Sequence, residues 1–193
     1  MSNTKFHNLF SVPFYSTILD ESIIKKVQNK VVPKLHLLND LTPKISNQKT
    51  DFHADKKIVD LDELPSLLDK IGYHLYEFTQ KFELPLYNSM KYWVQNYEKG
   101  DFHTKHSHPH SIISGVYYVQ ANKNAGKIIF YNPNPHILNS INISGEVEYK
   151  KQHFDIKPKS GLLILFPSYL IHKVVESKKK NTIRTCIAFN INR

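Results

Sequence analysis

The chain has 193 residues, of which 40% are hydrophobic and 22% charged, and its formal net charge at pH 7 is +9. This length suits one domain with its own core, and the apolar content excludes wholesale disorder because burial can offset the entropy of ordering. Cys186 is the only cysteine, which excludes an intrachain disulfide and any metal site built from several thiolates. A metal ion would therefore be held mainly by nitrogen and oxygen.

The first 90 residues predict one strand and two helices. Residues 8–20 have a β-like composition that Pro13 interrupts. Residues 20–39 carry apolar side chains at helical spacing, and residues 62–84 do so more clearly, so the second helix should pack against a sheet. The polar segment between them is rich in turn formers and predicts a loop. The apolar positions of the two helices are Ile23, Ile24, Val27, Val31, Leu64, Leu67, Leu68, Ile71, Leu75 and Phe78.

From Tyr92 onward the pattern changes to short β-like runs, many of them separated by Pro, Gly, Asn and Asp. Their spacing suits an antiparallel barrel or a double-sheet jelly roll, with the helices bracing its outside. The fold class expected is α+β, mainly β. We treat residues 1–193 as one domain, in which residues 1–90 supply helical support and an N-terminal strand and residues 91–193 form the jelly-roll core.

The N-terminus lacks the pattern of a signal peptide, and no window approaches the roughly 18 apolar residues that cross a bilayer. We therefore expect a cytoplasmic protein, of a bacterium or of a phage-infected host cell. Lysines are frequent in the C-terminal half, and a basic surface could bind nucleic acid or an acidic partner. No stripe of arginines interleaved with aromatics accompanies them, which favours solvated loop and edge-strand lysines instead.

The densest chemical signal is GDFHTKHSHPHS, residues 100–111, with four histidines. On a strand, His106 and His108 would point to the same face with Cα atoms about 6.5–7 Å apart, so one metal ion could reach both. Neutral imidazole suits Fe, Zn, Cu and Ni. The alternative is a histidine-rich loop that binds no metal or binds it adventitiously.

Two further polar residues lie in strongly apolar context. His172 follows the run GLLILFP, where an imidazole is costly unless it is hydrogen-bonded or ligated to a metal. A satisfied core histidine is the alternative. Arg184 lies in TIRTCIAFNI, and an arginine that faces inward there needs an anionic partner, for which its planar fork matches a carboxylate. An outward Arg184 would be an ordinary surface residue, but burial favours the inward orientation.

The order of these parts is H-x-H, SGVYYV, G-x-L-x-L-F-P-x-x-x-x-H and R-x-x-x-x-x-N. It resembles the Fe(II)/2-oxoglutarate-dependent oxygenases of the prolyl-hydroxylase-like group. It is particularly similar to their small bacterial and phage branch, whose pattern reads H-x-H-P and then S-G-V-Y-Y. The motifs cover residues 93–190, and NLFSVPFYSTIL also resembles the start of that branch. The resemblance implies a double-stranded β-helix, another name for this jelly roll.

The resemblance implies Fe(II) and 2-oxoglutarate as cofactor and cosubstrate. It assigns His106 as the first iron ligand and His172 as the last, while His108 stands where most of the superfamily has an aspartate. Three neutral ligands would leave the iron more positive than two histidines and a carboxylate.

For the cosubstrate, the resemblance assigns Arg184 and Tyr118 to the distal carboxylate of 2-oxoglutarate, and it makes Asn96 a further candidate contact. His103 occupies a position that is often aromatic in the family, so it is expected to line the pocket. His110 is expected to belong to the following loop.

The activity implied is hydroxylation of a C–H bond with release of succinate and CO2. The substrate stays open between a peptidyl side chain, a free amino acid, a small metabolite and an alkylated base, and a homodimer through the N-terminal helices is possible. Two other readings of the site stay open as well. One is a three-histidine cupin-type dioxygenase that does not use 2-oxoglutarate, and the other is a nonenzymatic jelly-roll binding module with a structural metal.

Overall fold

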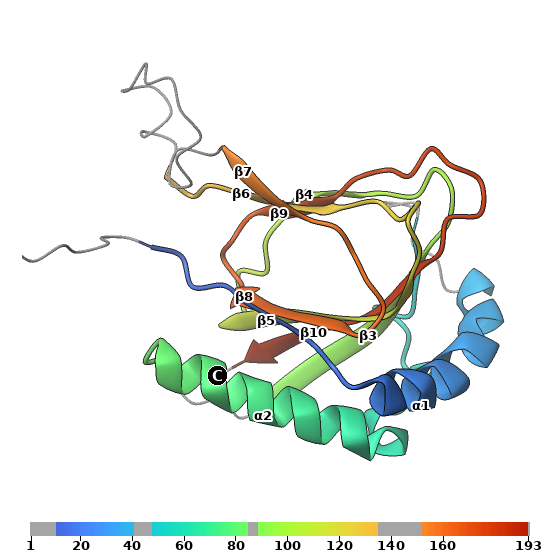
Figure 1. Cartoon of the computed structure of the whole chain (residues 1–193), viewed down its shortest axis with the longest axis horizontal. Helices are drawn as coiled ribbons and strands as arrows, with labels where there is room; N and C mark the ends of the chain where they lie inside the picture. Colours follow the sequence, from blue (N-terminus) through green and yellow to red (C-terminus); the bar gives the residue numbers. More distant parts are fainter. Residues whose placement is uncertain (1–10, 41–47, 85–88, 135–151, 193) are drawn as a thin grey trace, which may run out of the picture.

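The computed structural model describes residues 11–40, 48–84, 89–134 and 152–192 (Figure 1). Within them the strands form two antiparallel sheets. In spatial order, the large sheet contains β1 (Tyr15–Ile18), β8 (Leu162–Pro167), β5 (Ile113–Ala121), β10 (Arg184–Asn192), β3 (Ser89–Tyr97) and β2 (Lys49–Thr50). The small sheet contains β4 (His103–His106), β9 (His172–Val174), β6 (Ile128–Tyr131) and β7 (His153–Ile156).

Both predicted helices are present, as α1 (Glu21–Val31) and α2 (Pro65–Lys81), and they lie against one face of the large sheet (Figure 1). Short 3₁₀ helices follow α1 (Val32–Asp40) and precede α2 (Leu61–Glu63). A proline at the first position suits α2 because the amide hydrogen it lacks has no partner in a first turn. Among the described helices, none has the length together with the hydrophobicity that crossing a bilayer would require.

The central strands of the large sheet are buried on both faces, so their side chains divide between two cores. On β5, Tyr117 and Val119 join the core beneath the helices, whereas Val116 and Tyr118 join the core between the sheets. The same division along β10 sends Arg184, Cys186, Ala188 and Asn190 toward the second sheet, because successive side chains of a strand point to opposite faces. The candidate site lies in this space between the sheets.

The predicted class, α+β and mainly β with a double-stranded β-helix, is confirmed. The expectation of a barrel is wrong for the described residues. The two sheets face each other, but among the described strands no ladder joins their edges into a closed cylinder (Figure 1). β1 and β2, both from the first 90 residues, occupy the two edges of the large sheet. The β-like runs expected between residues 135 and 151 lie outside the described residues.

Candidate active site

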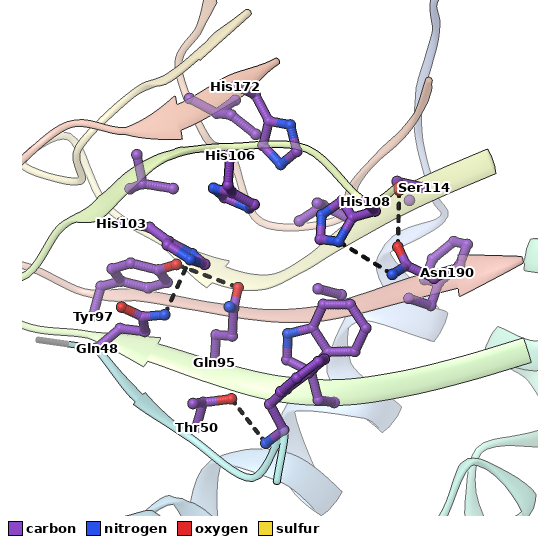
Figure 2. A pocket seen from close by; sticks show the side chains of 18 of the residues that line it. Gln48, Thr50, Gln95, Tyr97, His103, His106, His108, Ser114, His172 and Asn190 are labelled. Carbon is purple, nitrogen blue, oxygen red and sulfur yellow. Dashed lines mark hydrogen bonds between the residues drawn. The ribbon is translucent and has the colours of Figure 1, made fainter. Parts of the chain in front are cut away.

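A cavity of about 290 Å³ opens between the two sheets (Figure 2). Its floor comes from β3, β5 and β10 of the large sheet, and its roof from β4, β6 and β9 of the small one. Among the described residues that line it, none is Asp or Glu, one is arginine and five are histidines. The cavity therefore suits a ligand or a metal complex that brings negative charge.

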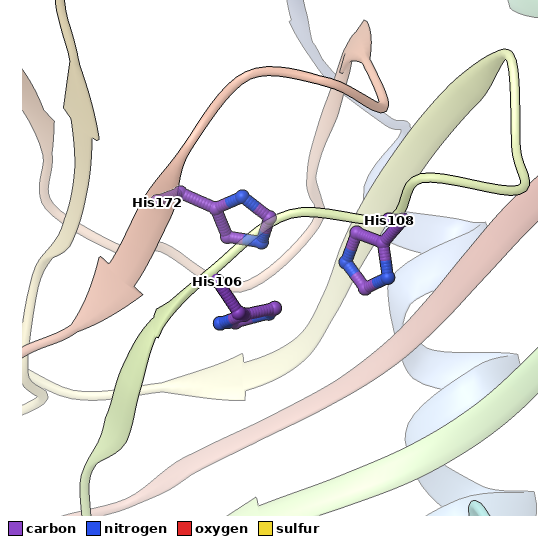
Figure 3. A group of neighbouring side chains, drawn as sticks. All are labelled: His106, His108 and His172. Atoms are coloured by element: carbon purple, nitrogen blue, oxygen red, sulfur yellow. The ribbon is translucent and has the colours of Figure 1, made fainter.

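His106, His108 and His172 converge in this cavity, with one potential ligand nitrogen of each within 4.8 Å of the others (Figure 3). His106 and His172 are directly opposite each other in the β4–β9 pairing, and their ring centroids are 4.2 Å apart. β4 ends at His106, so His108 lies just beyond the strand, where its backbone N–H donates to the carbonyl oxygen of Ser168 at 2.9 Å. The structure thus brings together the three histidines that the sequence singled out.

Hydrogen bonds fix which nitrogen of two of these rings carries the proton. Nδ1 of His106 lies 2.7 Å from the carbonyl oxygen of Thr104, and Nδ1 of His172 lies 2.9 Å from that of Leu170. A carbonyl oxygen can only accept, so each Nδ1 must be the donor. Nε2 of both neutral rings then keeps its lone pair, which is the form that ligates a metal.

Burial is the main reason that four cavity histidines stay neutral, namely His103, His106, His108 and His172. Loss of solvation lowers the pKa of His106 and lowers that of His172 well below its usual value. It also lowers the pKa of His108 to about 4 and that of His103 to about 3, with the neighbouring imidazoles adding to the effect. Neutral rings at physiological pH do not need to lose a proton before they bind a metal.

His103 is a fourth imidazole beside the cluster and lines the cavity, as expected. A bulge in the β4–β9 pairing lets His103 and His106, three positions apart, face the same side, and their rings stack at 3.9 Å. Nδ1 of His103 lies 3.3 Å from Nε2 of Gln48. Among the described residues, His103 is not part of the converging group. His110 is exposed in the loop after β4, also as expected.

Arg184 faces inward, only 1% of it is exposed, and it lines the cavity. Its guanidinium lies over the ring of Tyr97 at 4.1 Å, and its Nη2 donates to the hydroxyl of Tyr118 at 3.4 Å. Its Nε has no hydrogen-bond partner, and within the described part of the chain no carboxylate pairs with it. A buried cation without an anion is costly, so the geometry fits a carboxylate ligand at this position.

The expected contact of Asn96 with a cosubstrate needs correction. Side chains alternate along β3, and Trp93, Gln95 and Tyr97 are the ones that line the cavity. Asn96 points to the other face of the strand, where its Oδ1 accepts a hydrogen bond from Thr185 at 2.8 Å.

The sequence reasoning missed several polar cavity residues, among them Gln48 and Asn190. Gln48 is 2% exposed, and its Oε1 has no partner in the described structure. Nothing in its turn-rich surroundings signalled a buried site residue. Asn190 lies 3.2 Å from His108, Nδ2 to Nδ1 (Figure 2). The R-x-x-x-x-x-N motif contained a signal for it, because residues six apart on a strand share a face and Arg184 was expected to point inward.

The fold and the site together define a double-stranded β-helix protein with a three-histidine cluster beside a buried arginine. Residues 91–190 match the model of the family described as "Putative 2OG-Fe(II) oxygenase". Since the match spans more than half of the chain, this chain belongs to the 2OG-Fe(II) oxygenase family, as the resemblance implied. No curated protein matches it by sequence.

Solved structures support the same fold. A prolyl-4-hydroxylase from Pseudomonas putida has a TM-score of 0.68 at 14% identity, covering 96% of this chain and 95% of that one. A prolyl hydroxylase from Trichoplax adhaerens, in complex with a hypoxia inducible factor oxygen degradation domain peptide fragment, has a TM-score of 0.64 at 16% identity, covering 93% and 83%. The alpha-ketoglutarate-dependent epimerase SnoN from nogalamycin biosynthesis has a TM-score of 0.59 at 11% identity, covering 94% of this chain and 79% of that one.

Proposed function

We propose that this protein is an Fe(II)- and 2-oxoglutarate-dependent dioxygenase that hydroxylates a C–H bond of its substrate and releases succinate and CO2. The observation that carries the proposal is Arg184, a buried cation that lacks a carboxylate partner in the described structure and lines the same cavity as three neutral histidines. Family membership supports the choice of metal and cosubstrate.

In this proposal His106, His108 and His172 hold Fe(II). Their burial keeps the rings neutral, and the carbonyl groups of Thr104 and Leu170 orient two of them with Nε2 free. When bound, Fe(II) and 2-oxoglutarate supply the oxidising chemistry, which no protein side chain can provide. The protein contributes position, charge and exclusion of water.

Arg184 and Tyr118 would bind the distal carboxylate of 2-oxoglutarate. The guanidinium keeps its charge in proteins and offers parallel N–H donors, of which Nε has no partner in the described structure. Burial raises the pKa of Tyr118, so its hydroxyl stays protonated and can donate to the same carboxylate. The absence of acidic side chains from the described cavity wall removes any repulsion of a dicarboxylate.

The first test is a spectrum of the anaerobic protein. With Fe(II) and 2-oxoglutarate added, we expect the charge-transfer band of the chelated metal, and Arg184→Ala should weaken it by reducing cosubstrate affinity. Lys127→Ala is a matched control, because Lys127 is an exposed cation paired with Asp155 and should leave the band unchanged. Iron that is bound without any such band would count heavily against use of 2-oxoglutarate.

The set of three histidines also fits a second candidate function. Three histidines without a carboxylate are also the ligand set of three-histidine dioxygenases that bind their substrate directly, and Arg184 would then hold a carboxylate of the substrate itself. The two functions differ in their products. A screen for succinate release should cover peptidyl proline, other protein side chains, free amino acids, small metabolites and alkylated bases. Succinate formation supports the main proposal, and turnover of a substrate without succinate supports the alternative.

A further inference from the structure

We propose that Asn190 positions His108 for metal binding by turning its amide oxygen toward the ring. In this arrangement the hydroxyl of Ser114, itself hydrogen-bonded to that of Ser168, takes up the other end of the amide. This inference rests on the proposed function, since it assumes that the three histidines bind a metal. It assigns to Asn190 a positioning role rather than direct contact with the metal.

The contacts form a continuous buried chain behind His108. Nδ2 of Asn190 lies 3.2 Å from Nδ1 of His108, and the hydroxyl of Ser114 donates to Oδ1 of Asn190 at 2.8 Å (Figure 2). The hydroxyls of Ser114 and Ser168 are 2.9 Å apart. The backbone carbonyl oxygen of Ser168 also accepts the backbone N–H of His108, so the chain returns to the residue from which it starts. Asn190, Ser114 and Ser168 are all buried.

His108 differs from the other two histidines in the kind of partner that holds it. His106 and His172 donate Nδ1–H to backbone carbonyl oxygens, which cannot act as donors. Their protons are therefore fixed on Nδ1. Asn190 instead offers an amide, which presents a donor or an acceptor depending on which end faces the ring.

The end that faces the ring decides whether His108 can be a ligand. With Nδ2 toward the ring, Nδ1 must accept, so the proton of the neutral imidazole sits on Nε2. Nε2 points toward His106 and His172 (Figures 2 and 3) and would then have no lone pair to give. With Oδ1 toward the ring, Nδ1 carries the proton and Nε2 becomes free to bind.

The serine pair makes both arrangements possible. A hydroxyl can donate or accept, so Ser114 can donate to Oδ1 in one arrangement and accept from Nδ2 in the other. The hydrogen bond between the hydroxyls of Ser114 and Ser168 can reverse its direction to match, since either can be the donor. The two ends of the amide have nearly the same size, and half a turn needs no new space. We infer that metal binding selects the arrangement with Oδ1 toward His108.

Cobalt(II) titration tests the role, followed by visible absorption and by calorimetry as two readouts that do not depend on activity. Asn190→Ala should weaken Co(II) binding by roughly 10- to 100-fold, the usual effect of losing the partner of a ligating histidine. Asn190→Asp should bind at least as tightly as the wild type, since a carboxylate always accepts from Nδ1–H. Asn96→Ala is the matched control, because this asparagine faces away from the cavity and should leave Co(II) affinity unchanged.

A double-mutant cycle with His108→Ala separates positioning from general damage. In the His108→Ala background, Asn190→Ala should cause no further loss of affinity, because the residue it positions is gone. Wild-type affinity in Asn190→Ala, or an equal loss in both backgrounds, would overturn the inference. If Asn190→Ala fails to fold, Asn190→Asp decides, since Co(II) binding ten times weaker than wild type would also overturn it. A wild-type protein that binds no metal would instead refute the proposed function.

Discussion

At the scale of single residues, burial sets the protonation of the site. An unfolded histidine has a pKa near 6.5, whereas burial lowers the pKa of His103 to about 3 and that of His108 to about 4. Between about pH 4 and 6.5 the unfolded chain therefore binds more protons than the folded one. Stability of the metal-free protein should fall as pH decreases through this window, by up to about 1.4 kcal/mol per pH unit for each such histidine.

Urea unfolding of the metal-free protein at several pH values between 7.5 and 5 measures this dependence. His103→Phe removes one of the groups while keeping a ring in the cavity, so the slope of its unfolding free energy against pH should be shallower than that of the wild type. His110→Phe is the control, since His110 is exposed in the loop after β4 and should leave the slope unchanged. Equal slopes for the wild type and His103→Phe would contradict the lowered pKa of His103 in the folded protein.

Substitution of single histidines distinguishes the metal ligands from the residues that only lie beside them. We expect His103→Ala to keep its iron within a few-fold of the wild-type affinity, because His103 stacks on His106 but is outside the converging group of the described residues. His172→Ala should lose most of its iron. Anaerobic Fe(II) binding measured by metal analysis after gel filtration checks both, and complete loss in His103→Ala would mean that the three ligands are wrongly chosen.

How much of the site could be predicted from the sequence depends on whether the sequence shows which face of a strand each side chain lies on. The H-x-H pair was visible from the density and spacing of its histidines, whereas His172 and the inward Arg184 were visible because polar residues in apolar context are costly unless they have a function. Asn96 was named as a candidate contact without its face of the strand being known, and its side chain lies on the side away from the cavity, because a shift of one residue along a strand reverses that side. Gln48 could not be found, because nothing local indicates that a turn-rich segment returns to the cavity.

At the scale of elements, the helices and most described strands could be predicted, but the way the sheets meet could not. The apolar faces of α1 and α2 follow helical spacing, and the β-like runs after residue 90 that fall in the described residues correspond to strands. Whether facing sheets close into a barrel depends on pairing between edge strands far apart in sequence. No local pattern contains that information, which is why the expected barrel was wrong for the described residues.

One glycine shows how tightly the central strands are packed. A Cβ on Gly115 of β5 would lie 2.1 Å from the ring of Phe189 on the neighbouring β10. Gly115→Ala should therefore force the ring to move and destabilise the protein by about 1–3 kcal/mol, the usual cost of overpacking a core. Gly72→Ala in α2 is the matched control. It has open space around it and should stabilise the protein by about 0.5–1 kcal/mol through helix propensity.

Chemical denaturation of both variants measures these changes. A second variant, Gly115→Ala with Phe189→Leu, should recover part of the lost stability, because leucine leaves room where the ring was. Gly115→Ala with wild-type stability would show that the strands can separate to accept a methyl group and that the close contact is not a constraint.

At the scale of the whole molecule, folding is what creates the metal site. His106 and His172 are 66 positions apart in the sequence (172 − 106), and only the pairing of β4 with β9 places them opposite each other. A metal ion that needs both should bind the folded state far more tightly than the unfolded chain. Its binding energy then adds to the free energy of unfolding.

The size of this effect can be stated in advance. At a free metal concentration 100 times its Kd, stabilisation should be about 2.7 kcal/mol. For a domain of this length each kcal/mol raises Tm by about 2–4 °C, so thermal scans with Co(II) should show a rise of roughly 5–11 °C. His172→Ala should abolish the rise, whereas Arg184→Ala should keep it and lose only the further increase that 2-oxoglutarate gives the wild type. An equal rise in His172→Ala would show that the metal binds elsewhere, such as to exposed histidines.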